Sequence, residues 1–313
     1  MNPRFKCVAS NDAKDLVNFI IMKLHEELNK IKKNNNASNI SNIQIVQTNK
    51  LTIFKNFFIN FVKENQSIIR DLFYSANIIN TQCSGYKITK YNFQSYYFLI
   101  FPLEEIRKFK IEKLQHKIII NSNQNMLMNL NNPMMINMDM NQNMMIMNNP
   151  IIYQQFSACQ KNLQNNISIN LHDCFEYNQK IKCFYMYCNI CKNQLPASYR
   201  TFLYTTPEIL IIILNRGRGI EFNVKTEFTE SLNLYNYVER KETGYMYKLI
   251  GVVTHMDESG ANRHFIAFCK SPINNKWYKY NDNLVSEVFN IKQEIIEYDT
   301  TCMLFSEKIN NNF

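Results

Sequence analysis

The clearest pattern of hydrophobic and polar positions lies near the end of the chain, where three short apolar runs alternate with polar turns. The runs are Tyr247–Val253, His264–Cys269 and Lys276–Tyr280. Short runs of β-branched and aromatic residues, bounded by Gly, Pro, Asn and Ser, are typical of antiparallel strands. The turn at Ser271–Asn275 predicts that the last two runs pair as a hairpin.

A histidine and a polar pair stand at one end of this predicted hairpin. If the hairpin closes symmetrically, His264 lies opposite Asn281 or Asp282. An imidazole beside an amide or carboxylate is the orienting half of a Cys-His-Asn or Cys-His-Asp site. The acceptor fixes the ring tautomer and leaves the other nitrogen free to take a proton from a thiol. A purely structural histidine is the alternative interpretation.

Apolar positions at helical spacing predict an amphipathic helix in residues 10–29. Asn11 or Asp12 can cap its start, and Asp15 lies in the first turn, where the helix dipole favours an acid. His25, on the same helix, is expected to have a surface or packing role. A second helical region covers residues 51–73.

The middle of the chain alternates between strand patterns and polar tracts. Strands are predicted in residues 77–103, around a turn at 83–86, and in residues 207–216 and 222–234. Residues 167–184 indicate a strand end and a short helix whose core-facing side chains are Leu171, Cys174 and Phe175. Residues 30–49 are predicted to be a polar loop or a short disordered insertion.

Residues 108–165 are predicted to be a low-complexity insertion within a single domain of 1–313. Residues 104–120 are charged and form a candidate helix, whereas 121–149 are almost entirely Asn, Met, Gln and Ile. Such a tract buries too little apolar surface to offset the entropy lost on ordering, so we expect a loop.

The sequence Cys188-x-x-Cys191 has metal-ligand spacing, because two thiolates on a tight turn can reach one tetrahedral Zn²⁺. One such pair is half a site. The alternative is that these cysteines are free and pack as small hydrophobic side chains.

Composition narrows the class of protein. An odd number of cysteines, nine, without a signal-peptide pattern favours reduced thiols and a cytoplasmic or nuclear protein. The longest aliphatic run, Ile209–Leu214, is too short to span a membrane. The formal charge of +9 is scattered, which indicates a solvated surface and does not favour nucleic-acid binding.

The motif YKLIGVVTH…RHFIAFCK…WYKYNDNLV resembles the histidine box of the ubiquitin-specific proteases, the papain-like cysteine deubiquitinases. The resemblance implies that His264 is the catalytic histidine and that Asn281 is the third triad residue, with Asp282 beside it as a second candidate. One departure is Arg263, where the family usually has Gly, a residue that tolerates more backbone conformations.

Other segments extend the resemblance over most of residues 5–308 outside the insertion. The stretch NDAKDL resembles the family's Gln-Gln-Asp-Ala-x-Glu-Phe motif, which implies that Asp12 holds the basic C-terminal tail of ubiquitin. Cys83 resembles the start of the first Cys-x-x-Cys of the family's zinc ribbon, although Tyr86 replaces the second cysteine. Cys83, Cys188 and Cys191 would then be three zinc ligands. Residues 301–308 resemble the closing strand.

The expected fold is therefore the papain-like α+β fold of this family, with a partial helical thumb, β fingers and an antiparallel β palm. The resemblance also implies that catalysis needs no cofactor and that the partners are ubiquitin and ubiquitinated proteins. We expect no nucleic-acid or membrane partner.

The resemblance does not include the nucleophile: no Asn-x-Cys box precedes the Asp-Ala motif, and Cys7 lacks that context. Two functions stay open. The first is a thiol-dependent deubiquitinase truncated before its Cys box, and the second is an inactive ubiquitin-binding relative. A third interpretation is an Asn-rich α+β scaffold without a role in ubiquitin binding.

Overall fold

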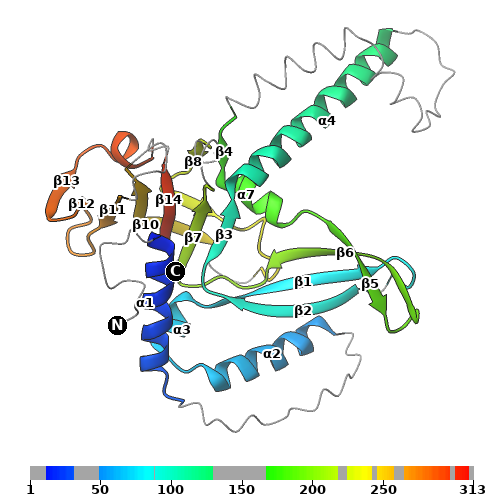
Figure 1. The fold of residues 1–313 in the computed structure, drawn as a ribbon, viewed down its shortest axis with the longest axis horizontal. Helices are drawn as coiled ribbons and strands as arrows, with labels where there is room; N and C mark the ends of the chain where they lie inside the picture. Colours follow the sequence, from blue (N-terminus) through cyan, green and yellow to red (C-terminus); the bar gives the residue numbers. More distant parts are fainter. Residues whose placement is uncertain are drawn as a thin grey trace.

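The computed structural model describes residues 12–31, 49–87, 89–129, 167–217, 224–241, 245–256, 264–296 and 300–309, with the backbone alone for 118–129. Asn11, Arg263, Cys7 and most of the predicted polar loop and insertion lie outside these ranges. Two sheets dominate the described residues, with helices on their faces (Figure 1).

The larger sheet has eight strands, and we call it the palm sheet. Its order is β13-β12-β11-β10-β14-β7-β3, and β9 also pairs with β10. All of its pairs are antiparallel except the parallel pair β3 and β7. The strands are β3 (Leu99–Pro102), β7 (Ile209–Asn215), β9 (Ser231–Asn233), β10 (Met246–His255), β11 (Phe265–Lys270), β12 (Trp277–Asn281), β13 (Leu284–Val288) and β14 (Thr301–Lys308).

The smaller sheet, which we call the fingers sheet, has four antiparallel strands in the order β2-β1-β6-β5. They are β1 (Ser75–Cys83), β2 (Thr89–Tyr96), β5 (Lys182–Cys188) and β6 (Asn193–Leu203). A short parallel pair joins β4 (Ile169–Asn170) to β8 (Thr226–Glu227). The strands predicted in residues 77–103 and in the C-terminal hairpin are thus present.

The helices are α1 (Ala13–Leu28), α2 (Lys50–Glu64), α3 (Ile68–Phe73), α4 (Leu103–Asn129) and α7 (Leu171–Asn178), with a π-helical turn η3 at Lys292–Ile296. Asp12 caps α1, as the sequence predicts. The predicted helical region 51–73 is divided, because Ser67 caps a separate helix α3 by accepting a hydrogen bond from the Arg70 amide.

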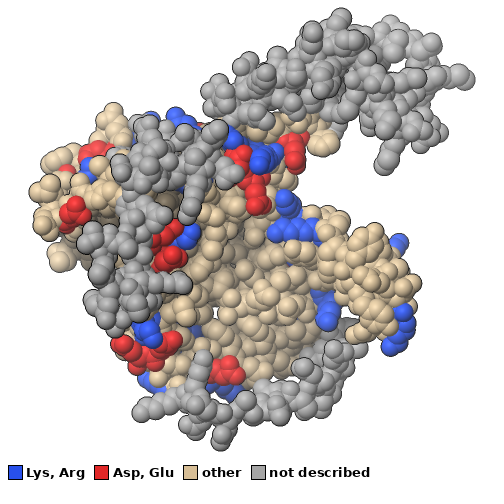
Figure 2. Space-filling view, viewed as in Figure 1, with Lys and Arg blue, Asp and Glu red and all other residues tan. Residues whose placement is uncertain are grey.

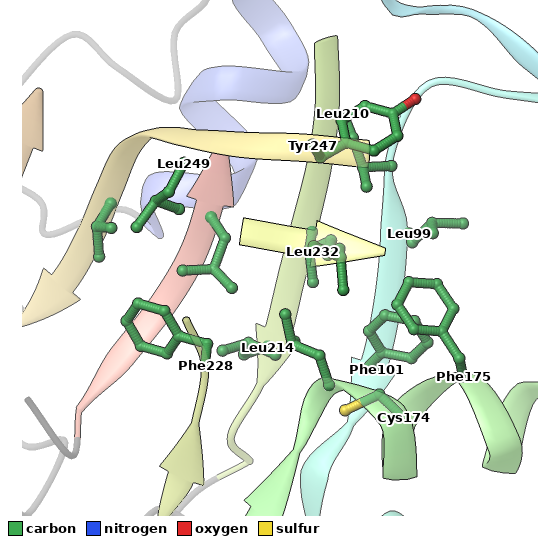
Figure 3. Close-up of a cluster of buried hydrophobic side chains, with 14 of the residues drawn as sticks. Leu99, Phe101, Cys174, Phe175, Leu210, Leu214, Phe228, Leu232, Tyr247 and Leu249 are labelled. Carbon is green, nitrogen blue, oxygen red and sulfur yellow. The ribbon is translucent and has the colours of Figure 1, made fainter. Parts of the chain in front are cut away.

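The hydrophobic core lies mainly on the face of the palm sheet that α4 and α7 cover. Figure 3 shows part of it, with Cys174 and Phe175 of α7 beside side chains of the palm strands. The sequence of β7 is a continuous apolar run because both faces of this strand are buried. Leu210, Ile212 and Leu214 point into this core, whereas Ile211 and Ile213 pack against α1 and α3 on the other face. A strand buried on both faces has no polar side to alternate with.

A histidine ties the end of α1 to the next helices. His25 Nδ1 lies 2.6 Å from Ser67 Oγ, and Nε2 lies 3.0 Å from Asn65 Oδ1. The ring therefore bridges α1 to the junction of α2 and α3. This contact fits the packing role that the sequence analysis expected for His25.

α4 begins in the folded domain and continues into the predicted low-complexity insertion. Its start belongs to the folded domain, because Ile106 and Ile111 are buried and Lys110 pairs with Asp173 of α7 at 2.7 Å. The helical backbone then continues through residues 121–129, where a loop was predicted. Once a helix is nucleated, each further residue adds one hydrogen bond for a small loss of conformational entropy. Residues with low helix propensity can therefore extend it.

No helix among the described residues combines the length and apolar character needed to cross a membrane.

Candidate functional site

Several strand ends meet at one end of the palm sheet. β10 ends and β11 begins there, with His255 paired to Phe265, and β12 ends there at Asn281. β14 begins beside them, where the His255 amide donates to the carbonyl of Thr300 at 3.1 Å. Neighbouring antiparallel strands run in opposite directions, so the end of one lies beside the start of the next. The register therefore gathers residues from distant parts of the sequence.

His264 comes directly before β11 and contacts Asn281 across the hairpin. Its Nε2 atom lies 2.6 Å from Oδ1 of Asn281. Because the amide oxygen can only accept, the ring donates Nε2–H, and in the neutral tautomer that this contact favours Nδ1 carries no proton. The side chain of His264 is 37% exposed, so a reacting group can reach the ring. The carbonyl of His264 accepts a hydrogen bond from the Met256 amide at 2.8 Å, which fixes the start of β11.

Asp282 is the weaker of the two predicted partners. Its Oδ2 atom lies 3.9 Å from His264 Nε2, and its side chain is 79% exposed. Asp282 has a φ of 49°, in the turn between β12 and β13. Asp is one of the few residues besides Gly that adopt this left-handed conformation. Water screens so exposed a carboxylate, so Asn281 is the main partner of the ring.

Asp12 lies at the start of α1. Its Oδ1 accepts a hydrogen bond from the Lys14 amide at 3.0 Å, and its Oδ2 pairs with Lys14 Nζ at 3.1 Å. The charges of Asp12 and Lys14 act on the thiol of Cys302, near the start of β14. Asp12 is therefore at the same end of the palm sheet as His264. Its side chain is 46% exposed, so a cationic ligand can compete with Lys14 for it.

Two cysteines on the palm sheet are held as thiols. The Sγ of Cys302 donates to the carbonyl of Val253 at 3.2 Å, and burial raises its pKa to about 12. Burial also raises the pKa of Cys269. A thiolate is the reactive form, so neither is a good nucleophile at neutral pH. Within the described ranges, no cysteine hydrogen-bonds the His264 ring.

The three predicted zinc ligands form a second cluster, at the outer end of the fingers sheet. The sulfur atoms of Cys83, Cys188 and Cys191 all lie within 4.8 Å of one another, and those of Cys83 and Cys191 are 3.9 Å apart. A tetrahedral Zn²⁺ with bonds of about 2.3 Å to sulfur separates its sulfur ligands by about 3.8 Å. The cluster therefore fits zinc with only small adjustments of the side chains.

Backbone amides favour the thiolate form of one of these cysteines, Cys188. Amides of Cys191 and Ile190 donate to Cys188 and lower its pKa to about 7. Burial has the opposite effect on Cys191 and raises its pKa to about 11. These amide donors, and Gly85 beside the cluster, were missed by the sequence analysis. The glycine two residues after Cys83 was a sequence signal for the close approach of that turn.

A buried histidine that the sequence analysis left without a role also lies at the His264 end of the sheet. His255 is 5% exposed and packs edge-on against Phe265, with ring centroids 4.9 Å apart. Its burial marks it as part of the packing under the site.

Comparison with known proteins shows which protein family the chain matches. The family model described as "Ubiquitin carboxyl-terminal hydrolase" matches residues 1–305. The rat protein "Ubiquitin carboxyl-terminal hydrolase 48" is 31% identical over 123 residues, which are 37% of this chain and 12% of that protein. The "Probable ubiquitin carboxyl-terminal hydrolase 16" of Schizosaccharomyces pombe is 31% identical over 121 residues, 36% of this chain and 26% of that protein. The match thus spans about a quarter or less of these relatives.

Solved structures show the same fold. A structure of the yeast SAGA DUB module matches with a TM-score of 0.59 and 17% identity, over 96% of this chain and 51% of that chain. A SAGA DUB module bound to monoubiquitin matches with a TM-score of 0.51 and 18% identity, over 83% of this chain and 48% of that chain. These likenesses confirm the predicted α+β fold, with α1 to α3 as the helical thumb beside the fingers and palm sheets.

Proposed function

The chain belongs to the ubiquitin carboxyl-terminal hydrolase family, and from that premise we propose that it acts in thiol-dependent hydrolysis of the bond after the C-terminal glycine of ubiquitin. The contact of 2.6 Å between His264 Nε2 and Asn281 Oδ1 carries the proposal. It supports a base whose free nitrogen is Nδ1 and whose orientation is set by a neutral acceptor.

In the proposed reaction His264 moves one proton at Nδ1. It takes the proton from a cysteine thiol while the sulfur bonds to the carbonyl carbon of the glycine. It then gives the proton to the leaving amine as the C–N bond breaks. Water hydrolyses the resulting thioester, again with His264 as base. Asn281 holds the ring through each step without adding charge, so stabilisation of the imidazolium is weaker than a carboxylate would give.

A second candidate is ubiquitin binding without hydrolysis. It is favoured by one observation, that no described cysteine hydrogen-bonds the His264 ring. The proposal therefore assigns the nucleophile to none of these cysteines. Both candidates share ubiquitin as the partner, and one of the similar solved structures is bound to monoubiquitin.

We assign Asp12 to ubiquitin's basic C-terminal tail in both candidates. The test is the affinity of the 313-residue chain for ubiquitin. Asp12 also caps α1, so Asp12→Asn, which keeps a capping side chain, separates charge from helix stability. For an exposed ion pair we expect Asp12→Asn to lose about 0.2–1 kcal/mol, or up to about fivefold in Kd. Asp12→Arg adds repulsion and should bind more weakly still.

Glu27→Arg is the matched control, because it reverses an exposed charge at the other end of the same helix. It should leave the affinity unchanged. Equal affinity for all four proteins would place ubiquitin elsewhere.

Ubiquitin with a thiol-reactive C-terminal group separates the two candidates when it is offered to the chain with an Asn-x-Cys box restored before the Asp-Ala motif. Covalent labelling that His264→Ala abolishes supports hydrolysis, because the thiol then depends on this base. Binding without labelling supports the second candidate. Labelling that persists in His264→Ala contradicts the role given to His264.

A further inference from the structure

The fingers sheet differs from the rest of the chain in its charge. Its strands and turns lie in residues 75–96 and 179–206, which contain no Asp or Glu, so all 26 acidic residues of the chain are elsewhere. The same two segments contain six basic residues: Lys87, Lys90, Lys180, Lys182, Lys192 and Arg200. Figure 2 shows the fingers sheet at the right, with Lys and Arg at its outer end and no acidic residue there. The sheet therefore presents positive charge without acidic residues of its own.

β5 is an open edge of this sheet. The strand order β2-β1-β6-β5 places it at the end, and in the part of the chain that the structure describes it pairs only with β6. One side of its backbone therefore has amides and carbonyls without a strand partner. Such an edge is a template on which an extended peptide can add as a further strand.

The side chains of β5 alternate between two kinds. Successive residues of a strand point to opposite faces of the sheet. Tyr185 and Tyr187 lie on one face and are 72% and 59% exposed. Ile181, directly before the strand, has the same parity and is 61% exposed. Lys182 lies on the other face. β5 thus presents an exposed apolar face and a basic face along one open edge.

The register extends the basic face across the sheet. Lys182 pairs with Tyr199 of β6. Tyr199 pairs in turn with Thr81 of β1, and Thr81 pairs with Lys90 of β2. Residues paired across antiparallel strands share a face, so this row has a lysine at each end. Lys182 Nζ lies 5.8 Å from the centroid of the Tyr199 ring, and neither segment of the fingers sheet supplies a carboxylate to pair with it.

We propose that the free edge of β5 binds an extended peptide whose side chains alternate between acidic and apolar, and that this peptide adds to the fingers sheet as a fifth strand. Its backbone pairs with the open side of β5. Its acidic side chains lie on the face of Lys182, and its apolar side chains lie on the face of Tyr185. The charge of the sheet selects an acidic peptide over a basic one, and the alternation of β5 selects the pattern. This inference does not depend on the proposed action on ubiquitin.

The test measures the fluorescence anisotropy of the labelled peptide Glu-Val-Glu-Val-Glu-Val-Glu with the full chain, at low salt and without ubiquitin. We expect saturable binding that weakens as salt rises, because exposed charges are screened. The peptide Lys-Val-Lys-Val-Lys-Val-Lys should not bind. The peptide Glu-Pro-Glu-Pro-Glu-Pro-Glu has the same charge, but proline has no N–H and is poorly accommodated in a strand. It should bind at least about tenfold more weakly.

Two variants test the two faces of β5. Tyr185→Ser should raise Kd by up to about fivefold, the value of one cross-strand contact, and Lys182→Glu should raise it further because it adds repulsion. Lys55→Glu is the matched control, since it reverses an exposed charge on α2, and it should leave Kd unchanged. The melting temperature of each variant establishes that it is folded.

Several results would overturn the proposal. One is a natural chain that does not bind the alternating peptide. Equal binding of the Glu-Pro peptide would mean that charge acts without strand addition. An unchanged Kd in both Lys182→Glu and Tyr185→Ser would place the peptide elsewhere. Tighter binding of an oligothymidine of equal length would assign the surface to single-stranded nucleic acid.

Discussion

The hydrogen bond between His264 and Asn281 gives the sharpest test of the candidate site. Asn281→Ala removes the acceptor of the Nε2–H group, which lies at 2.6 Å in the structure. The neutral ring is then free to carry its proton on either nitrogen and to turn about its side-chain bonds. We expect the variant to populate the Nδ1–H form, in which the ring cannot take a proton at that nitrogen.

The size of the effect follows from the value of one hydrogen bond. A neutral hydrogen bond contributes about 0.5–1.5 kcal/mol net. Its loss therefore weakens the preference for the Nε2–H tautomer by about twofold to twelvefold. The assay is a long-range ¹H–¹⁵N correlation spectrum of the ring nitrogens at mildly alkaline pH. The chain has five histidines, so His264→Gln identifies the signals of His264.

Two variants at the same turn serve as controls. Asn281→Asp keeps an acceptor oxygen and should retain the Nε2–H tautomer. Asn283→Ala removes an exposed amide two residues away and should leave the spectrum unchanged. If the ¹⁵N shifts of His264 are the same in Asn281→Ala as in the natural chain, Asn281 does not set the tautomer and the argument for its role fails.

Three further predictions concern the fold that holds the site. Phe175 is 1% exposed, so Phe175→Ala leaves a cavity in the core and should lower the free energy of unfolding by about 3–5 kcal/mol in denaturant titrations. A loss below 1 kcal/mol would contradict this packing. His25→Ala removes two hydrogen bonds and should cost about 1–3 kcal/mol, whereas the exposed His116→Ala should cost almost nothing. Burial, and then Glu105, raise the pKa of Tyr177 to about 12 from 10.0. The resulting stability is complete below pH 10.0 and is lost between there and about 12. The difference in Tm between the natural chain and Tyr177→Phe should therefore shrink over that range, and a constant difference would refute the assignment.

Local features of the structure could be predicted from the sequence because they depend on near neighbours along the chain. Asp12 begins α1 because a side-chain oxygen can satisfy the first free amides of a helix. The hairpin of β11 and β12 follows from two apolar runs and one short turn. The buried strand β7 follows from its continuous apolar run, although pattern alone did not say which residues would cover each face.

The sequence pattern failed where local signals were weak. Residues 121–129 have the composition of a loop, yet they continue α4. The break between α2 and α3 is set by the cap at Ser67, inside a segment whose apolar spacing predicts one helical region. At Ser67 the start of α3 was decided by a side-chain hydrogen bond that residue composition does not encode.

Residue patterns were enough to predict the type of each main element, the resemblance to the family, and a short set of chemically capable residues. The closer contact of His264 with Asn281 than with Asp282 came from the folded sheet, because one residue of register in the hairpin separates the two outcomes. Only the tertiary structure brought Cys83 to Cys191 across 108 positions of sequence, at a sulfur distance of 3.9 Å. Periodicity and capping act over a few residues, whereas these contacts depend on how whole strands align when the sheets pair.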